Sequence, residues 1–124
     1  MTRRGHRQAA CLAALAVLVC APIRFTSAAR PDLTGVDALV RVYDSILDAD
    51  FDQADAELQR ACGPAPREAC DVLAATAMWW RIQLDPESRA LDDDFSAAIE
   101  KAIAATEAWT ERMPDSAEAH FYTG

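Results

Sequence analysis

One stretch limits the fold more than any other. Residues 62–84, CGPAPREACDVLAATAMWWRIQL, read as a turn followed by a helix that is apolar on nearly every side. Two adjacent apolar stripes follow this helix: Leu73, Ala77, Trp80 and Leu84 form one, and Val72, Ala75 and Trp79 form the other. Because both stripes need cover, we expect the helix to lie in the middle of an all-helical domain, between segments with one apolar face each.

The neighbouring segments have the single apolar stripe that such covers require. The expected helices span residues 31–47, 51–62, 66–84, 95–113 and 117–122, with a polar loop over 87–94. Thr34 is the expected cap of the first helix, with Asp37 three residues on. Asp50 is the expected cap of the second, with Gln53 in the capping-box position. The short break between these two helices predicts a helical hairpin.

Residues 1–29 have the three parts of a secretory signal. A start with three arginines is followed by an apolar run over 9–19 and by small residues at 27–29. The run is shorter than the roughly 20 residues that span a bilayer. We therefore predict a cleaved signal peptide and a periplasmic or secreted location for residues 30–124, with an uncleaved membrane anchor as the alternative.

The end of the apolar run offers a second route to the envelope. Val17-Leu18-Val19-Cys20 resembles a bacterial lipoprotein box, in which Cys20 becomes the lipidated first residue, although that box usually has a small residue where Val19 stands. Contact with a membrane is thus expected only through the signal segment or through a lipid at Cys20.

The charge of the chain argues against nucleic acid as a partner. Residues 30–124 hold eight basic and twenty acidic residues, a formal charge of −12, and no basic stripe. Such an acidic body repels phosphate backbones.

Two cysteines remain after the signal segment. Cys62 and Cys70 flank a Gly-Pro-Ala-Pro turn, and an even pair in an exported protein predicts a disulfide that joins one helix end to the next helix start. Two buried thiols or a metal pair are the alternatives. A metal would need more ligands than these two residues supply.

No arrangement of residues indicates catalysis. Acidic residues alternate over 48–52 as in a calcium loop, but Gln53 stands where that loop needs glycine. The acids at 92–94 are better placed to favour a helix start than to bind a cation. His120 is the only histidine after the signal segment, with no Ser, Cys or acid assigned near it. We expect no catalytic residue, no metal and no cofactor.

The end of the chain suggests a longer protein. The expected last helix begins a few residues before Gly124 and carries exposed Phe121 and Tyr122, so it has nothing to pack on. An enzyme whose site lies in a further part of the protein therefore remains an alternative.

The hairpin pattern resembles the tetratricopeptide repeat, a helix pair of about 34 residues that stacks into a solenoid. Residues 35–68 match it through the acid-aromatic-acid turn at 50–52, the small residues Ala54 and Ala61, and the closing Pro66. A degenerate second repeat covers 69–116, with a longer loop and a longer last helix. The resemblance implies a TPR-like domain over residues 30–124, with a generic helical bundle as the alternative.

The same resemblance implies a function. The family binds proteins or peptides on the concave face formed by the first helix of each pair. Mapped onto this chain, that face holds Leu39, Tyr43, Ile46 and Leu47 from the first repeat and Leu73, Ala77, Trp80 and Arg81 from the second. Trp80 and Arg81 are the expected anchors, because aromatic and arginine side chains dominate binding hot spots. In the alternative interpretation, Trp79 and Trp80 belong to the core.

These patterns predict an exported helical-repeat protein that mediates protein–protein interaction without catalysis. The alternatives are a helical front domain of an exported enzyme and a lipid-anchored envelope protein.

Overall fold

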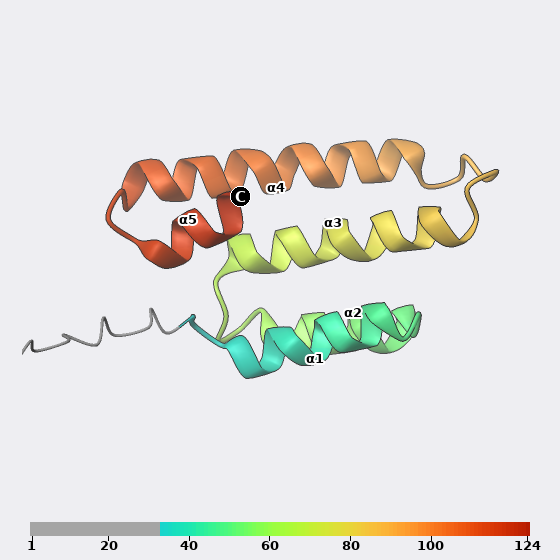
Figure 1. The fold of residues 1–124 in the computed structure, drawn as a ribbon, viewed down its shortest axis with the longest axis horizontal. Coiled ribbons are helices and arrows are strands. Elements are labelled where there is room, and N and C mark those ends of the chain that lie inside the picture. The colour runs from blue at the N-terminus through green and yellow to red at the C-terminus, as the bar shows by residue number, and fades with distance from the viewer. Residues whose placement is uncertain (1–32) are drawn as a thin grey trace, which may run out of the picture.

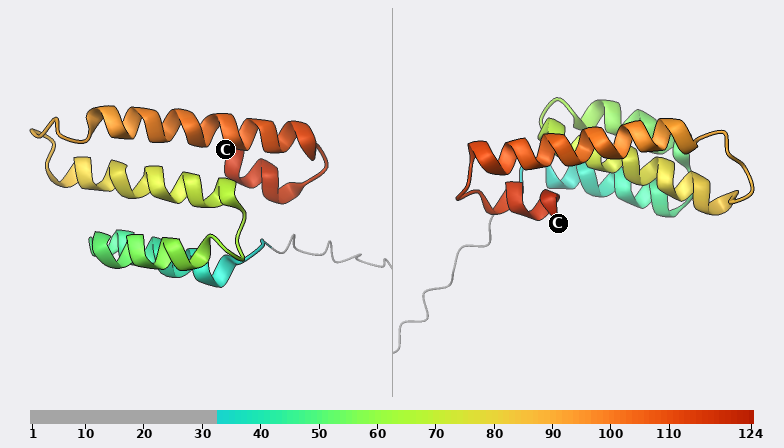
Figure 2. Two further views of the ribbon diagram at one scale, coloured as in Figure 1. Left: turned by 180° about the vertical axis from the view of Figure 1, so that it is seen from behind. Right: turned by 90° about the horizontal axis from the view of Figure 1, so that it is seen from above.

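The computed structural model describes residues 33–124, which form five helices and, within that range, no strand. The helices are α1 (Val36–Leu47), α2 (Phe51–Ala61), α3 (Arg67–Leu84), α4 (Asp92–Arg112) and α5 (Ala117–Thr123). Consecutive helices run in opposite directions. The pair of α1 and α2 forms one layer, α3 lies on it, and α4 lies on α3 (Figure 1; Figure 2). The expected all-α fold of antiparallel helical hairpins is confirmed.

The apolar helix α3 lies in the middle of the molecule, as its sequence predicts. One side closes a core with α1 and α2, and the other side packs along α4. Trp80 contacts the core of α1 and α2, whereas Trp79 keeps 42% of its surface exposed. At the centre of α3, Ala75 and Ala77 are therefore buried, whereas Trp79 is exposed.

The core of the first layer combines branched residues from α1 with alanines from the helices around it. Leu39, Val42 and Ile46 point inward, and Ile46 and Val42 are the largest fully buried side chains of the described residues. The alanines facing them are Ala54, Ala61, Ala69 and Ala77. Small side chains at these positions let the helix backbones approach closely, so the branched residues of α1 fill the space.

The expected cap at Thr34 is wrong. Gly35 is the N-cap of α1, with φ of 68° and no side-chain cap, and the helix begins at Val36 rather than near residue 31. A Cβ atom at Gly35 would lie 2.9 Å from the Cβ of Ala65. Both the backbone angle and this close approach require glycine. A contact between distant segments thus determines how α1 starts, and Thr34 bonds to Glu118 of α5 instead.

The turn between α1 and α2 forms two backbone hydrogen bonds that close the helix end. The Ala49 N–H donates to Ile46 O at 3.0 Å, and the Asp50 N–H donates to Ser45 O at 3.0 Å. Ala49 has φ of 59°, a conformation that glycine usually supplies. The carboxylate of Asp50 then accepts from the Gln53 N–H at 3.1 Å, so the predicted cap of α2 is confirmed.

Two other helix starts differ slightly from the expectation. Pro66 is the N-cap of α3 rather than its first-turn residue. The helix α4 begins at Asp92, three residues before Phe95, so the acids at 92–94 form its first turn. Carboxylates are favoured there because the start of a helix carries partial positive charge.

Some predictions fall on residues that are not described. The signal peptide over 1–29 and the lipidation at Cys20 lie outside residues 33–124. Within that range, no helix combines the length and the hydropathy needed to cross a bilayer.

Candidate interaction surface

The helix α1 is apolar on two adjacent faces, and one of them is open to solvent. The open face consists of Val36, Val40, Tyr43 and Leu47, which we call the α1 stripe. Their spacing of four, three and four residues aligns them along one side of the helix. Each is between 40% and 53% exposed. About half of the surface of each side chain is therefore left open by the described part of the chain.

Acidic residues border the stripe on the side away from the core. Asp37, Asp44 and Asp48 lie there at helical spacing, and we call them the acidic edge. All three are exposed, and none forms an ion pair with residues 33–124. The apolar stripe is therefore bordered by carboxylates that form no ion pair within the described residues.

Arg41 and Arg60, the cations on α1 and α2, form ion pairs with Glu57 and not with the acidic edge. Glu57 of α2 lies 2.7 Å from Arg60 and 3.8 Å from Arg41. The hydrogen bond from Arg60, with the charges of both arginines, lowers the pKa of Glu57 against a smaller effect of burial. Arg41 also donates to the carbonyl oxygen of Asp37 at 3.0 Å. Its guanidinium thus faces α2 and the backbone, rather than the carboxylates of the acidic edge.

The residues predicted to bind a partner occupy different environments. Leu39 is buried at 5% exposure, and Leu73 and Trp80 pack against the same core. Tyr43 belongs to the α1 stripe. The structure therefore brings Leu39, Leu73 and Trp80 to one core, in which Leu73 and Trp80 are partly buried, and leaves Tyr43 exposed.

Arg81, the other predicted anchor, joins α3 to α2. Its guanidinium donates to the Asp55 carboxylate at 2.7 Å and to the Phe51 carbonyl oxygen at 3.3 Å. It also lies 5.0 Å from the centroid of the Phe51 ring. Arg81 thus has partners within the domain, through both charge and a cation–π contact.

The open surface is larger than the resemblance predicts. The resemblance places Tyr43 and Leu47 on the binding face but not Val36 and Val40, although the spacing of all four is a helical signal. Trp79 is the exposed aromatic residue of α3, and its ring meets that of Trp80 edge-on at 5.0 Å between centroids.

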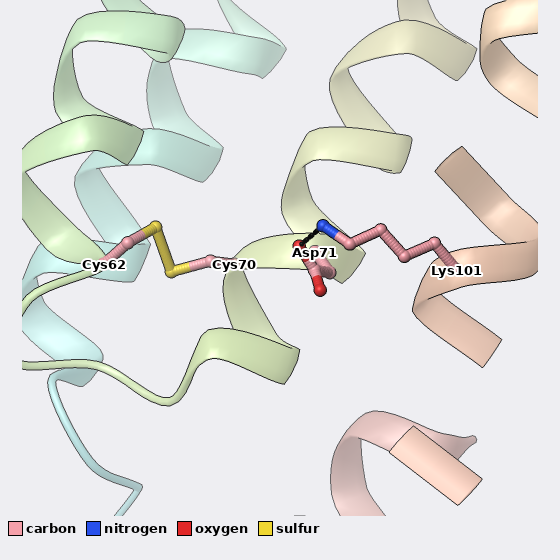
Figure 3. The surroundings of a disulfide bond; sticks show 4 residues. All are labelled: Cys62, Cys70, Asp71 and Lys101. Carbon is pink, nitrogen blue, oxygen red and sulfur yellow. Dashed lines mark hydrogen bonds and ion pairs between the residues drawn. A yellow bond between two sulfur atoms is a disulfide. The ribbon is translucent and has the colours of Figure 1, made fainter. Parts of the chain in front are cut away.

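The two cysteines lie within bonding distance, as predicted. A disulfide links Cys62, the C-cap of α2, to Cys70 in the first turn of α3, with 5.9 Å between their Cα atoms. The next residue, Asp71, points the other way and accepts from Lys101 of α4 at 2.7 Å (Figure 3). Consecutive residues thus attach α3 to both neighbouring layers.

The expectation that the last helix has nothing to pack on is wrong, because α5 contacts α4 and α3 and bonds to the beginning of the described chain. The backbone N–H and the hydroxyl of Thr34 both donate to the Glu118 carboxylate. Tyr122 stacks on Trp109 with ring centroids 6.1 Å apart. Burial, and secondarily the charge of Glu118, raises the pKa of Tyr122. Nε2 of His120 lies 2.8 Å from the Pro114 carbonyl oxygen, so the ring is held against the turn that precedes α5.

A hollow at the end of α3 is small. It encloses about 240 Å³ and is lined by Arg81, Ile82, Asp85, Ser88, Ala90 and Leu91. Pockets for small ligands are usually about 300–1,000 Å³. Within residues 33–124, no group of three or more His, Cys, Asp or Glu side chains is placed to hold a metal ion.

Comparisons with protein-family models, curated proteins and solved structures give no match to this chain. Over the described residues, fold and surface define it as an all-helical domain whose first helix holds four exposed apolar side chains along one face.

Proposed function

We propose that this chain is an exported, non-catalytic helical-repeat protein that binds another protein. The observation that carries the proposal is the α1 stripe. Contiguous apolar surface that remains in water is unfavourable, and such patches mark sites of association. Four apolar side chains in register on one helix meet that description, whereas single exposed apolar residues are common on any protein.

The arrangement of the helices supports the repeat part of the proposal. The first helices of the two pairs, α1 and α3, run in the same direction, and each is followed by an antiparallel partner (Figure 1). Alanines lie at the helix contacts, as the resemblance to tetratricopeptide repeats implies. Stacked pairs of this kind present an extended surface, which suits binding rather than an enclosed reaction site.

The disulfide supports export. Disulfides persist in oxidising compartments and are rare in the cytosol. The Cys62–Cys70 bond therefore agrees with the secretory pattern of residues 1–29.

Site-specific photo-cross-linking in the cells that produce the protein tests the proposal. A photoreactive amino acid replaces Tyr43 in the α1 stripe of the full chain, and a matched variant carries it at Gln59, an exposed position of α2. We expect a light-dependent adduct with another protein from position 43 and a much weaker one from position 59. Equal adducts from both positions, or none from position 43, would contradict the proposal.

Fractionation of the same cells tests the export. The chain should be found outside the cytoplasm and shortened by about the length of the signal segment. Full-length protein in the cytoplasm would contradict this part.

A further inference from the structure

We propose that the occupant of the α1 stripe is an amphipathic helix of the partner protein with lysine or arginine along one flank. This inference rests on the proposed function, because it names the chemistry of the partner that the same surface takes.

The geometry of the stripe favours a helix over an extended segment. Val36 and Leu47 lie eleven residues apart, so the stripe is about 16 Å long. Its side chains recur every three or four residues, which matches the ridges of a second helix laid alongside. An extended segment would bring unpaired backbone groups against α1, and the backbone of α1 is bonded within its own helix. A helix satisfies its own backbone and offers only side chains.

The acidic edge determines the charge of the partner. Asp37, Asp44 and Asp48 run beside the stripe and form no ion pair within the described residues, because Arg41 on the same helix is directed to Glu57 and to the Asp37 carbonyl oxygen. Asp44 and Asp48 lie at the carboxyl end of α1, where the helix itself carries partial negative charge, and its last turn has no basic residue. Cations on the partner would relieve this repulsion. They should be concentrated at the end of the partner helix that meets Leu47.

The same charges disfavour two other occupants. A second copy of this chain would carry the same acidic edge, and residues 30–124 of each copy have a formal charge of −12. An anionic membrane would be repelled in the same way. A basic helix is the occupant that complements both the apolar and the charged part of the surface.

A designed peptide tests the inference directly. The probe is a dye-labelled helix of about 18 residues with leucines on one face, lysines on one flank and alanines elsewhere. The matched control peptide carries glutamate in place of lysine. With the full, oxidised chain, we expect the lysine peptide to bind at least about ten-fold more tightly than the glutamate peptide in fluorescence anisotropy. Its affinity should fall about ten-fold between about 50 and about 300 mM salt, and its circular dichroism should show added helix on binding.

Surface variants locate the site. We expect the double variant Val40→Ser with Leu47→Ser to weaken binding of the lysine peptide at least about ten-fold, because two apolar side chains no longer become buried against the peptide. Asp44→Asn with Asp48→Asn should weaken it about ten-fold and flatten the salt dependence. The matched controls are Ile103→Ser on α4 and Asp52→Asn on α2, both exposed, which should stay within about two-fold of the parent. Cooperative thermal unfolding of each variant confirms that it is folded.

Several results would overturn the inference. These are equal binding of the lysine and glutamate peptides, equal losses in the stripe and control variants, or no gain of helix by the bound peptide. A dimer of the chain that Val40→Ser with Leu47→Ser dissociates would also overturn it, because a second copy would then be the occupant. If position 43 cross-links to a protein in cells but the lysine peptide does not bind, this inference fails and the proposed function stands. If position 43 gives no adduct, the proposed function fails.

Discussion

The hairpin of α1 and α2 encloses branched aliphatic side chains, whereas the residues buried along α3 and α4 are small, with Trp109 as the exception. In the first region, Val42 and Ile46 are each 1% exposed. In the second, the residues buried along α3 and α4 include Ala75 and Ala102, and two ion pairs connect the helices.

The difference indicates two ways to stabilise a helix pair. Burial of large apolar side chains supplies most of the stability of α1 and α2, because the free energy follows the apolar area removed from water. In α3 and α4, small residues allow close contact between the backbones. Two ion pairs align α3 with α4: Asp71 lies 2.7 Å from Lys101, and Glu68 lies 2.8 Å from Arg112. Loss of side-chain volume should therefore lower stability most in the first region, and added side-chain volume should lower it most in the second.

The largest effect is expected from removing volume inside the first hairpin. Ile46→Ala should lower the free energy of unfolding by about 3 kcal/mol, because it removes buried methyl groups and leaves a cavity. The control is Ile103→Ala on the half-exposed face of α4, which should cost less than about 1 kcal/mol. Urea unfolding of the full chain measures both. Similar losses of unfolding free energy for Ile46→Ala and Ile103→Ala would contradict the stated difference between the two regions.

The disulfide should give the next largest effect, because it connects the two regions. Cys62 and Cys70 are eight positions apart, and closing a loop of that size contributes about 2.5 kcal/mol in the chain-entropy model. Cys62→Ala with Cys70→Ala should lose that amount in urea. The unmodified protein should lose it only when a reductant is added. An unchanged free energy of unfolding of the parent protein in the presence of reductant would contradict the prediction.

Added volume should be harmful between α3 and α4. Ala102→Leu should cost about 2 kcal/mol, because its side chain has no room where Ala102 is 3% exposed. Ala104→Leu, at an exposed position of the same helix, keeps the helix propensity and should change stability by less than about 0.5 kcal/mol. Thermal unfolding distinguishes them. A neutral Ala102→Leu would show that the second region packs more loosely than the structure indicates.

The ion pairs should contribute least. A double-mutant cycle of Asp71→Asn and Lys101→Met should give a coupling free energy below about 1 kcal/mol, because the lysine side chain is 57% exposed and water screens the pair. The coupling should shrink further in high salt. A coupling well above this value, unchanged by salt, would mean that charge rather than close packing holds the second region together.

The sequence predicts the helices and the central place of α3 because its apolar residues recur at helical spacing. It does not predict which apolar face of α1 is buried. Leu39 and Tyr43 both fit a helical stripe, and only packing against α2 and α3 decides that Leu39 points inward. The start of α1 was predicted wrongly for a related reason, because Gly35 touches Ala65 thirty residues later.

The candidate surface was predicted in part. Tyr43 was assigned to a binding face from a resemblance, and it does lie in solvent. Trp80 and Arg81 were assigned in the same way, but a helical pattern does not reveal that Phe51 and Asp55 lie beside Arg81. Disulfide pairing was easier to predict, because only two cysteines follow the signal segment and a short turn keeps them close.

The contact between Thr34 and Glu118 bears on the order in which the domain forms. The two residues are separated by 84 positions, so the contact cannot form until nearly all of the described chain has been synthesised and brought together. The local turns of α1 and α2 face no such delay. In a refolding experiment followed by hydrogen exchange, the amide of Thr34 should therefore be among the last to become protected, and it would serve as a marker of completed assembly.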